Sequence, residues 1–513
     1  MPTLDNTPQR RELLVAGAAT AALALAPSFG QAKDQSTLTG AGRRSIERYL
    51  TLQEGALQRT RQAGTVGSAD WTPRSPVNLT DRILLWHEVS LDTNALDYVP
   101  PAAGGRYHQQ FGPHKSARAI TFIQLAVFEA VNAKYRKFQS YIGFHFRPGT
   151  WSVDAAVAQA SNDAQVHHYP PQADRLAAIL KADLAHIHDD PAAIAIGRAV
   201  GADAFASLLL ALGNDNTTLE EPTIPDDYRP SHKYGIWDVD PVSQIMVALG
   251  GNWGKVIPFT FVNPAAFRAP PPPVAGGAAY RAEFKAVAAL GGDPRMGTPS
   301  TRTDHQTFMG KFWSYDGTPG LCAPPRLFNM MARQLILARG MHTPIDLARF
   351  LALINVGMAD SAVSCWEAKY YYKYWRPITG IRWPGAPGGD PTWYPLGAQA
   401  TNTTGPNFTP PFPAYPSGHA TIVGTLFQIL RAYIPDHTPF AFVSDEFNGM
   451  NRDVYGNIRP LRPATFSSLT DAESSCAESR IWIGVHWQSD GDQGVAQGRN
   501  VGRHVLETFA LPR

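Results

Sequence analysis

The stretch Ser116–Tyr135, SARAITFIQLAVFEAVNAKY, sets the fold class of this chain. It opens with serine, a residue that caps helix N-termini, and its apolar side chains recur at positions i, i+3 and i+4. This spacing puts the apolar side chains on one face of an α-helix, whereas a β-strand would need alternation with a period of two. We therefore expect a long helix whose apolar face packs against other helices.

The same periodicity recurs along most of the chain after Thr80, and alternating strand patterns are scarce. Further helices are predicted at Asp174–His188, Ala192–Leu212, Arg281–Leu290, Asp304–Trp313, Leu327–Arg339, Pro344–Tyr374, Ser417–Tyr433, Asp471–Arg480 and Asp492–Phe509. We expect one large all-α domain of packed helical bundles. The 44 glycines and 43 prolines exceed the usual combined share of about 12%, so long Pro/Gly-rich loops should connect the helices.

The charge balance argues against two classes of partner. The 513-residue chain carries 45 Lys and Arg against 43 Asp and Glu, a formal net charge of +2. This balance lacks the basic excess that binds nucleic acids or anionic membranes, so no nucleic-acid partner is expected. The hydrophobic share of 44% and the charged share of 17% exclude wholesale disorder and allow a large buried core.

The three cysteines, Cys322, Cys365 and Cys476, are far apart and form no C-x-x-C pair. An odd number at such spacings argues against a disulfide framework or a structural zinc site. We expect buried free thiols, with a single disulfide as the alternative.

The N-terminus has the pattern of an export signal. A pair of arginines precedes the apolar run Leu13–Ala26, and small residues follow it. The run is too short to span a bilayer, and paired arginines are typical of the twin-arginine route. We interpret residues 1–32 as a twin-arginine signal peptide, which predicts a periplasmic or secreted protein; an ordinary Ala/Leu-rich helix is the alternative. Residues 33–79 are polar and Arg-rich and are interpreted as an N-terminal extension.

A membrane span in the mature chain is not expected. After the N-terminal run, no segment has 18 uninterrupted apolar residues.

Cationic side chains have an unusual spacing in the segment KYYYKYWRP, residues 369–377. Lys369 and Arg376 lie seven positions apart, which is two helical turns, so both are expected on the same helix face. Pro377 should end the helix and hold Arg376 at its mouth. Alone, such a pair is usually a solvated helix face.

Two further segments carry polar groups next to an expected turn. In PSGH, Ser417 is a natural N-cap for the apolar helix that follows, and Gly418 leaves its backbone amide accessible. The free N–H groups of a helix N-terminus attract anions, and His419 stands beside them. In SRIWIGVH, Arg480 and His486 are six positions apart across a glycine that lets the chain turn.

Together, the three segments supply three cations, a hydroxyl, a backbone amide and two histidines. Arginine binds oxyanions through its planar fork, whereas lysine acts as a point charge. This collection fits a tetrahedral oxyanion better than a carboxylate.

The order and spacing of these segments, K-x6-R-P, P-S-G-H and S-R-x5-H, resembles the shared signature of vanadium-dependent haloperoxidases and type 2 phosphatidic acid phosphatases. Stretches that look like vanadium chloroperoxidases in particular are Phe408–Ala420, Trp313–Gly317, Asn448–Asp453, Gly484–Trp487, Ile83–Asn94 and Ser116–Ala133. The resemblance covers about residue 80 to the C-terminus. It implies that residues 80–513 form the catalytic domain, built as two four-helix bundles packed together, with the site between helices.

The resemblance also implies a role for each residue of the signature. The cofactor would be vanadate, with no haem or flavin, and His486 would be the vanadium ligand. Lys369, Arg376 and Arg480 would neutralise the oxo groups, and Ser417 and the Gly418 N–H would complete the shell. His419 would be the acid–base residue, since a histidine pKa lies near neutrality. Lys369 would also polarise bound hydrogen peroxide.

Four flanking residues match family positions as well. Trp366 and Phe412 would line the halide side, where an apolar wall desolvates the anion; core packing is their alternative reading. Asp490 would orient the second ring nitrogen of His486, or else act as a helix-start carboxylate. Asp316 would pair with Arg480, or else be a turn residue before a glycine.

The expected activity is oxidation of bromide, and of chloride, by hydrogen peroxide to give hypohalous acid. An acid phosphatase is the first alternative, with His486 as phosphohistidine nucleophile and His419 protonating the leaving group. A non-enzymatic oxyanion-binding protein is the second. A small organic acceptor and the oligomeric state are left open by the sequence.

Overall fold

The computed structural model describes residues 76, 78–98, 109–146, 149–318, 320–398, 407–449, 458 and 460–513. The predicted signal peptide and nearly all of the predicted extension lie outside these residues. The helices of the described chain are α3 (Leu79–Leu96), α4 (Pro113–Tyr135), α5 (Val153–His168), α6 (Ala173–Leu184), α7 (Pro191–Leu212), α8 (Ala278–Leu290), α9 (Asp304–Phe312), α10 (Pro324–Ala338), α11 (Pro344–Tyr372), α12 (Pro377–Ile381), α13 (Gly418–Leu430), α14 (Leu469–Trp482) and α15 (Gln488–Thr508).

Short elements complete the described chain. The 3-10 helices are η2 (Pro170–Gln172), η3 (Trp253–Lys255), η4 (Pro264–Phe267), η5 (Pro294–Met296) and η6 (Asp445–Phe447). Two three-residue strands, β1 (Phe440–Phe442) and β2 (Ala464–Phe466), pair antiparallel with Phe440 opposite Phe466. They form the only sheet among the described residues, so the predicted all-α fold class is confirmed.

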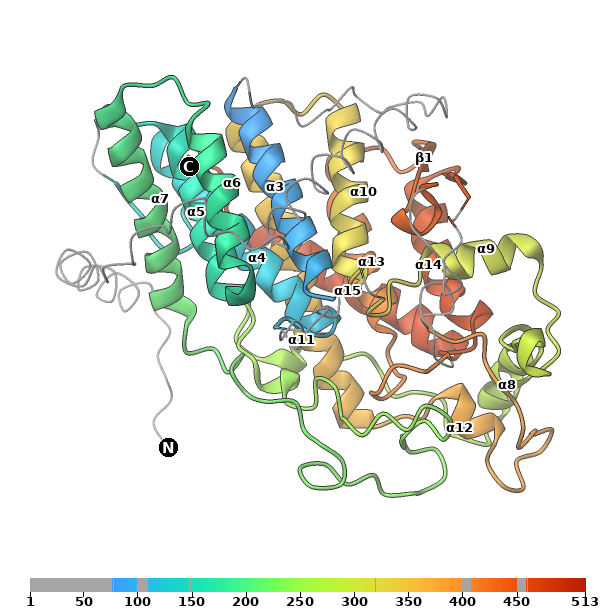
Figure 1. Ribbon diagram of the computed structural model, residues 1–513. Helices are drawn as coiled ribbons and strands as arrows, with labels where there is room; N and C mark the ends of the chain where they lie inside the picture. The colour runs from blue at the N-terminus through green and yellow to red at the C-terminus, as the bar shows by residue number, and fades with distance from the viewer. Residues whose placement is uncertain are drawn as a thin grey trace.

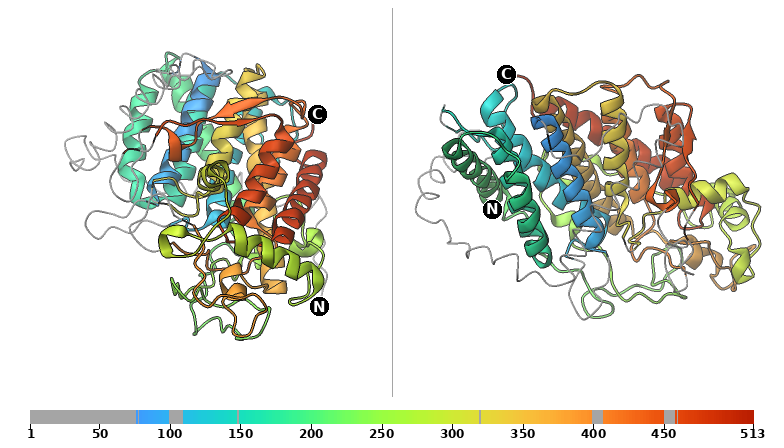
Figure 2. Two further views of the ribbon diagram at one scale, coloured as in Figure 1. Left: turned by 90° about the vertical axis from the view of Figure 1, so that its right-hand side faces the viewer. Right: turned by 45° about the horizontal axis from the view of Figure 1, so that its top comes forward.

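The helices pack as two bundles side by side (Figures 1 and 2). Helices α3, α4, α5 and α7 contact one another in the first bundle, and α11, α13, α14 and α15 in the second. Helix α11 contacts α4 as well as α13 and α15, so it joins the two bundles. The short helices α8 and α12 pack together beside the second bundle, where long loops also gather (Figure 1).

Helices α4 and α11, which contact each other where the two bundles meet, are buried on all sides. In α4, every side chain from Ser116 to Ala133 is buried, so this helix is a core element instead of the amphipathic one that the spacing predicted. A helix that is apolar all round belongs in the interior of a large domain.

Within the described residues, α7 and α11 are long and apolar enough to cross a membrane by length and composition. The apolar window of α11 is 94% buried in the protein, whereas that of α7 is 39% buried.

Helix α5 was not predicted, and its composition explains why. Its buried positions are mostly alanines, which give a weaker periodic signal than leucine or isoleucine. Ser152 caps it, because its hydroxyl accepts a hydrogen bond from the Ala155 N–H at 3.1 Å. Against it lies α7, where a Cβ on Gly197 would come within 2.1 Å of the Ser152 carbonyl oxygen. Small residues on both helices therefore let the two backbones approach closely.

A second close approach joins α13 and α15 in the other bundle. A Cβ on Gly498 would lie 2.0 Å from the Thr421 carbonyl oxygen, and one on Gly494 would lie 3.0 Å from the Ser417 carbonyl oxygen. Because the obstacles are backbone atoms, neither can move aside alone. All three cysteines are free and buried, as expected from the sequence.

We predict that Gly498→Ala lowers the free energy of unfolding by about 1–3 kcal/mol, the usual cost of overpacking a core. Gly491→Ala on the same helix is the control, since its Cβ would meet ordinary contacts at 3.6 Å and beyond. That control should be neutral or slightly stabilising, because alanine favours helix over glycine. Denaturant unfolding of both variants measures the difference. Equal stabilities would mean that α13 and α15 are farther apart than described.

Candidate active site

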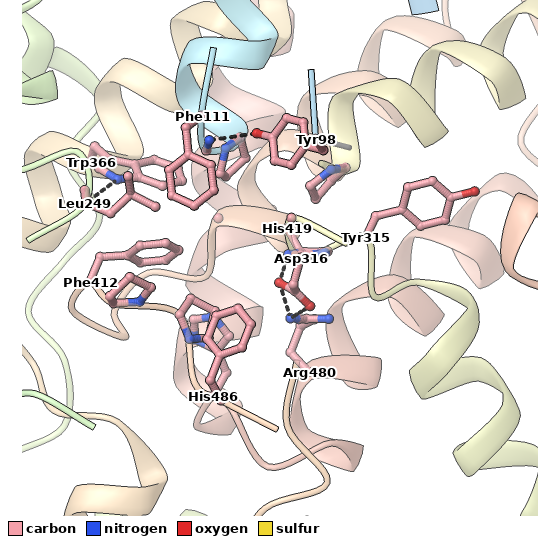
Figure 3. A pocket seen from close by; sticks show the side chains of 18 residues that line it. Tyr98, Phe111, Leu249, Tyr315, Asp316, Trp366, Phe412, His419, Arg480 and His486 are labelled. Carbon is pink, nitrogen blue, oxygen red and sulfur yellow. Dashed lines mark hydrogen bonds and ion pairs between the residues drawn. The ribbon is translucent and has the colours of Figure 1, made fainter. Parts of the chain in front are cut away.

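A cavity of about 50 Å³ lies where the two bundles meet. Side chains that are far apart in the sequence line it (Figure 3). Its lining residues include Tyr98, Phe111, Leu249, Tyr315, Asp316, Trp366, Phe408, Phe412, Gly418, His419, Arg480 and His486. By the same measure one water needs roughly 10–15 Å³, so the cavity has room for a few water-sized species.

The N-terminus of α13 reaches the cavity through the PSGH segment. Ser417 is the N-cap, and its hydroxyl accepts a hydrogen bond from the Ala420 N–H at 3.4 Å. Gly418 and His419 are the first residues of the helix and both line the cavity. Ser417 is fully buried and does not line it, so its contact with an anion stays a prediction.

His486 presents a ring nitrogen with a lone pair. Its Nδ1 lies 2.8 Å from Asp490 Oδ2, and its Nε2 lies 3.0 Å from Arg376 Nη1. A guanidinium can only donate, so Nε2 is the acceptor and Nδ1 carries the hydrogen. Burial, followed by the charge of Arg376, holds the pKa of His486 well below its ordinary value. The imidazole is therefore neutral, which is the form that binds a metal.

Asp490 supports this histidine and also starts α15. Besides the ring nitrogen, its Oδ2 accepts the Trp487 N–H at 2.9 Å. Both readings of this residue therefore apply, orienting carboxylate and helix-start carboxylate. Burial raises the pKa of Asp490 to about 8, although the hydrogen bond from Trp487 and the charge of Lys369 act in the opposite direction.

The arginines keep donors that the described residues do not use. Arg480 Nη2 donates to both oxygens of Asp316, at 2.8 and 2.6 Å, but its Nε and Nη1 find no partner among the described residues. Arg376 donates from Nε to Phe412 O and from Nη1 to Val485 O, leaving Nη2 unpaired in the described chain. Buried, unused N–H donors are costly unless a ligand accepts them.

The chain does not run as one helix from Lys369 to Arg376, which corrects the prediction. Helix α11 ends at Tyr372 because Lys373 adopts left-handed backbone angles, with φ 53°. Pro377 starts the next helix, α12, and Arg376 is its N-cap. Proline suits the first turn of a helix as well as it suits a helix end. Both cations nevertheless lie over the ring of Phe412, at 5.0 and 4.8 Å from its centroid.

Lys369 is used by the backbone around it. Its Nζ donates to the carbonyl oxygens of Pro413 at 2.9 Å, Ala414 at 2.8 Å and Pro416 at 2.5 Å. Burial lowers the pKa of Lys369 to about 7. Lys369 does not line the cavity, so its predicted contact with an anion or with peroxide stays a prediction. What the structure assigns to it is the course of the loop before α13.

His419 faces the cavity as a neutral imidazole. Its Nε2 lies 2.8 Å from Ser314 O and 3.1 Å from Trp313 O, so Nε2 carries the hydrogen and Nδ1 can accept a proton. Asp316 Oδ1 lies 3.9 Å from that Nδ1. Burial and then the charge of Arg480 lower the pKa of His419 to about 4.

An apolar wall faces these polar groups across the cavity (Figure 3). The rings of Trp366 and Phe412 lie 5.1 Å apart, and both side chains are buried. Leu249 and Phe111 extend the wall from other parts of the chain. No sequence pattern marked these last two residues, because they reach the cavity through folding of distant loops.

The described donor set fits a tetrahedral oxyanion. Arg480, His486 and the N-terminus of α13 line the cavity, and Arg376 contacts His486 Nε2; both arginines keep N–H groups that the described residues do not use. By contrast, no cluster of three or more His, Cys, Asp or Glu side chains that could hold a bare metal ion exists in the described part of the chain. One histidine bond plus several hydrogen bonds is the coordination that an oxyanion of a metal can accept. Vanadate therefore fits the residues present.

Comparison with known proteins agrees with this fold. Residues 349–511 match the family model described as the VCPO second helical-bundle domain. Vanadium chloroperoxidase of Curvularia inaequalis is 29% identical over 504 residues, which covers 80% of this chain and 79% of the relative.

Solved structures with the same fold include a bacterial vanadium-dependent iodoperoxidase, with a TM-score of 0.67 and 22% identity over 85% of this chain and 98% of that one. Another is a holo-type bacterial vanadium-dependent chloroperoxidase, with a TM-score of 0.57 and 17% identity over 81% and 97%.

The fold and the site define a helical protein with a cavity between two bundles, lined by groups that fit an oxyanion. The comparisons then confirm the resemblance to the vanadium-dependent haloperoxidase family, and the match to the second-bundle model covers α13, α14, α15 and most of α11.

We predict that Asp490→Ala weakens binding of orthovanadate or phosphate by about 10- to 100-fold, because His486 loses the partner that fixes its ring and tautomer. Asp492→Ala is the control, since this exposed carboxylate on the same turn bonds only Gln488. Titration calorimetry on the purified protein compares the two. Equal affinities would remove Asp490 from the binding machinery.

Proposed function

We propose that this protein is a vanadate-dependent haloperoxidase that oxidises bromide, and chloride more slowly, with hydrogen peroxide. The observation that carries the proposal is the neutral His486, a cavity-lining residue whose Nε2 is an acceptor bonded to Arg376 Nη1, beside arginine N–H groups that find no partner among the described residues. The apolar wall of Trp366 and Phe412 supports it, since a phosphate-ester site has no need of a dry cavity next to the anion. The family resemblance supports it independently.

When bound, vanadate would supply a Lewis-acid centre that activates peroxide without changing its own oxidation state. His486 would hold it through Nε2. The N–H groups of Arg376, Arg480 and Gly418 would donate hydrogen bonds to its oxygens and balance its negative charge. Ser417 and Lys369 complete the proposed shell.

His419 would move the proton of the incoming peroxide. Its Nδ1 is free to accept, because Nε2–H is committed to two backbone carbonyls. The low pKa keeps it unprotonated at near-neutral pH, so it is ready to act as a base. Asp316 accepts a hydrogen bond from Arg480, and its charge, 3.9 Å from His419 Nδ1, would favour the imidazolium once that nitrogen takes up a proton.

The wall of the cavity would strip water from the halide and leave it reactive. The small volume also favours release of hypohalous acid to acceptors outside. We further propose export to the periplasm or beyond, supported by the paired arginines and apolar run at the N-terminus.

Purified apo-protein should brominate a phenol dye when given orthovanadate, peroxide and bromide, and phosphate should suppress this by competing for the site. His486→Ala should lose nearly all activity, because the one covalent anchor is gone. His504→Ala is the control: it removes a histidine of α15 outside the cavity. Dye absorbance reports the rate. Bromination that is indifferent to vanadate, or hydrolysis of phosphate esters alone, would sink this proposal and favour the phosphatase.

Phe412→His should lower chloride oxidation more than bromide oxidation, because a polar ring admits water and chloride is the harder anion to desolvate. The quantity to measure is the chloride-to-bromide ratio of kcat/KM. Phe267→His, a change outside the cavity, should leave the ratio as in wild type. An unchanged ratio in Phe412→His would mean that the Phe412 ring contributes only to core packing.

A further inference from the structure

His114 and Glu221 form a buried pair directly behind the apolar wall of the cavity. His114 is the second residue of α4 and is fully buried, and its Nε2 lies 3.0 Å from Glu221 Oε1. Neither residue lines the cavity. The pair belongs to none of the three motifs.

The ring of His114 supports the indole of Trp366. Their centroids are 5.1 Å apart with the planes tilted by 38°, and Trp253 packs edge-to-face against the same imidazole at 4.7 Å. Phe412, which lines the cavity, lies 5.1 Å from the same indole. The indole therefore contacts one ring that lines the cavity and one that does not.

Glu221 fixes the backbone that holds the edge of the indole. Its second oxygen accepts the N–H of Gly250, and Lys115 Nζ approaches the first at 3.2 Å. Gly250 has a positive φ of 76°, and a Cβ there would lie 2.1 Å from two indole atoms. The neighbouring carbonyl oxygen of Leu249 accepts the Trp366 N–H at 3.1 Å.

One carboxylate thus ties together the ring behind the indole and the loop beside it. With its N–H bonded to Leu249 O, the indole cannot donate to a halide and shows the cavity a dry surface. His114 Nδ1 finds no hydrogen bond among the described residues, and burial lowers the pKa of His114 although Glu221 acts against this shift.

We propose that His114 and Glu221 are a positioning pair that sets the plane of the Trp366 indole and thereby the halide preference of the cavity. The inference rests on the proposed haloperoxidase function. A loosened indole would free its N–H and admit water, which hurts chloride more than bromide because chloride holds its hydration more strongly.

Steady-state kinetics of His114→Ala test the pair. We expect the KM for chloride to rise about three- to tenfold, the scale of one aromatic pair, with bromide KM and both kcat values within about twofold. His114→Phe keeps a ring behind the indole and should shift the chloride KM less. Glu221→Gln keeps the shape and tests the clamp if His114→Ala fails to fold. Lys115→Gln, which touches Glu221 but not the indole, is the control.

Iodide quenching of Trp366 fluorescence supplies a second readout that needs no turnover. The Trp366 component is the difference between each protein and its Trp366→Phe counterpart, and His114→Ala should change its quenching constant while vanadate affinity stays as in wild type. An unchanged chloride-to-bromide ratio, or quenching that His114→Ala does not alter, overturns the proposal that the pair positions the indole. If wild type halogenates nothing, the proposed function fails, and quenching alone then decides whether the pair positions the indole.

Discussion

The cost of burying positive charge governs the second bundle and the loops around it. Lys369, Arg376 and Arg480 are at most 1% exposed, yet the carboxylates beside them are only Asp316 and Asp490. Burying an ion without partners costs several kcal/mol, so the remaining partners must come from the backbone. Carbonyl oxygens of the loop before α13 and of the turn after α14 supply them. Hydrogen bonds to the buried cations therefore determine the path of these loops.

The backbone does not accept from every N–H donor of the buried cations. The unused donors couple ligand binding to folding, and the pKa of the buried lysine couples it to protonation. A ligand that accepts the unused N–H groups binds only the folded chain, so it stabilises that chain by mass action. Burial lowers the pKa of Lys369 to about 7, and an anion nearby would raise it again. Binding of an anion close to Lys369 would thus be coupled to proton uptake.

Sequence reasoning found what leaves a local signal. The predicted helices with bulky apolar side chains are present, and α4 extends the stretch SARAITFIQLAVFEAVNAKY by three residues at its start. Alanine-rich α5 was missed, because helices that meet through alanine and glycine hide their packing face. The helix expected to join Lys369 to Arg376 was wrong, since a left-handed Lys373 has no sequence signature of its own.

The candidate site divides in the same way. Arg480, His419 and His486 could be proposed together from the spacing of their motifs, and Asp316 from the resemblance of its stretch to the family, and the structure gathers them around one cavity. Tyr98 and Leu249 could not be proposed, because contacts across more than one hundred residues follow from the path of loops. The same holds for His114, which looks like any helix-start histidine until Trp366 is placed against it.

The glycine contacts between α13 and α15 fix the distance between the residues at the N-terminal ends of these two helices. Helix α13 begins at the Ser417–Gly418 turn, and α15 begins two residues after His486, with Ser417 N–H donating to Asp490 O at 2.8 Å. Backbones that touch directly leave no side chains whose rotamers could let one helix slide past the other. The distance between the histidine and the helix N-terminus is therefore set before any cofactor arrives. If vanadate binds here, a site held rigid in this way would load at a rate set by diffusion into the cavity instead of by a conformational change.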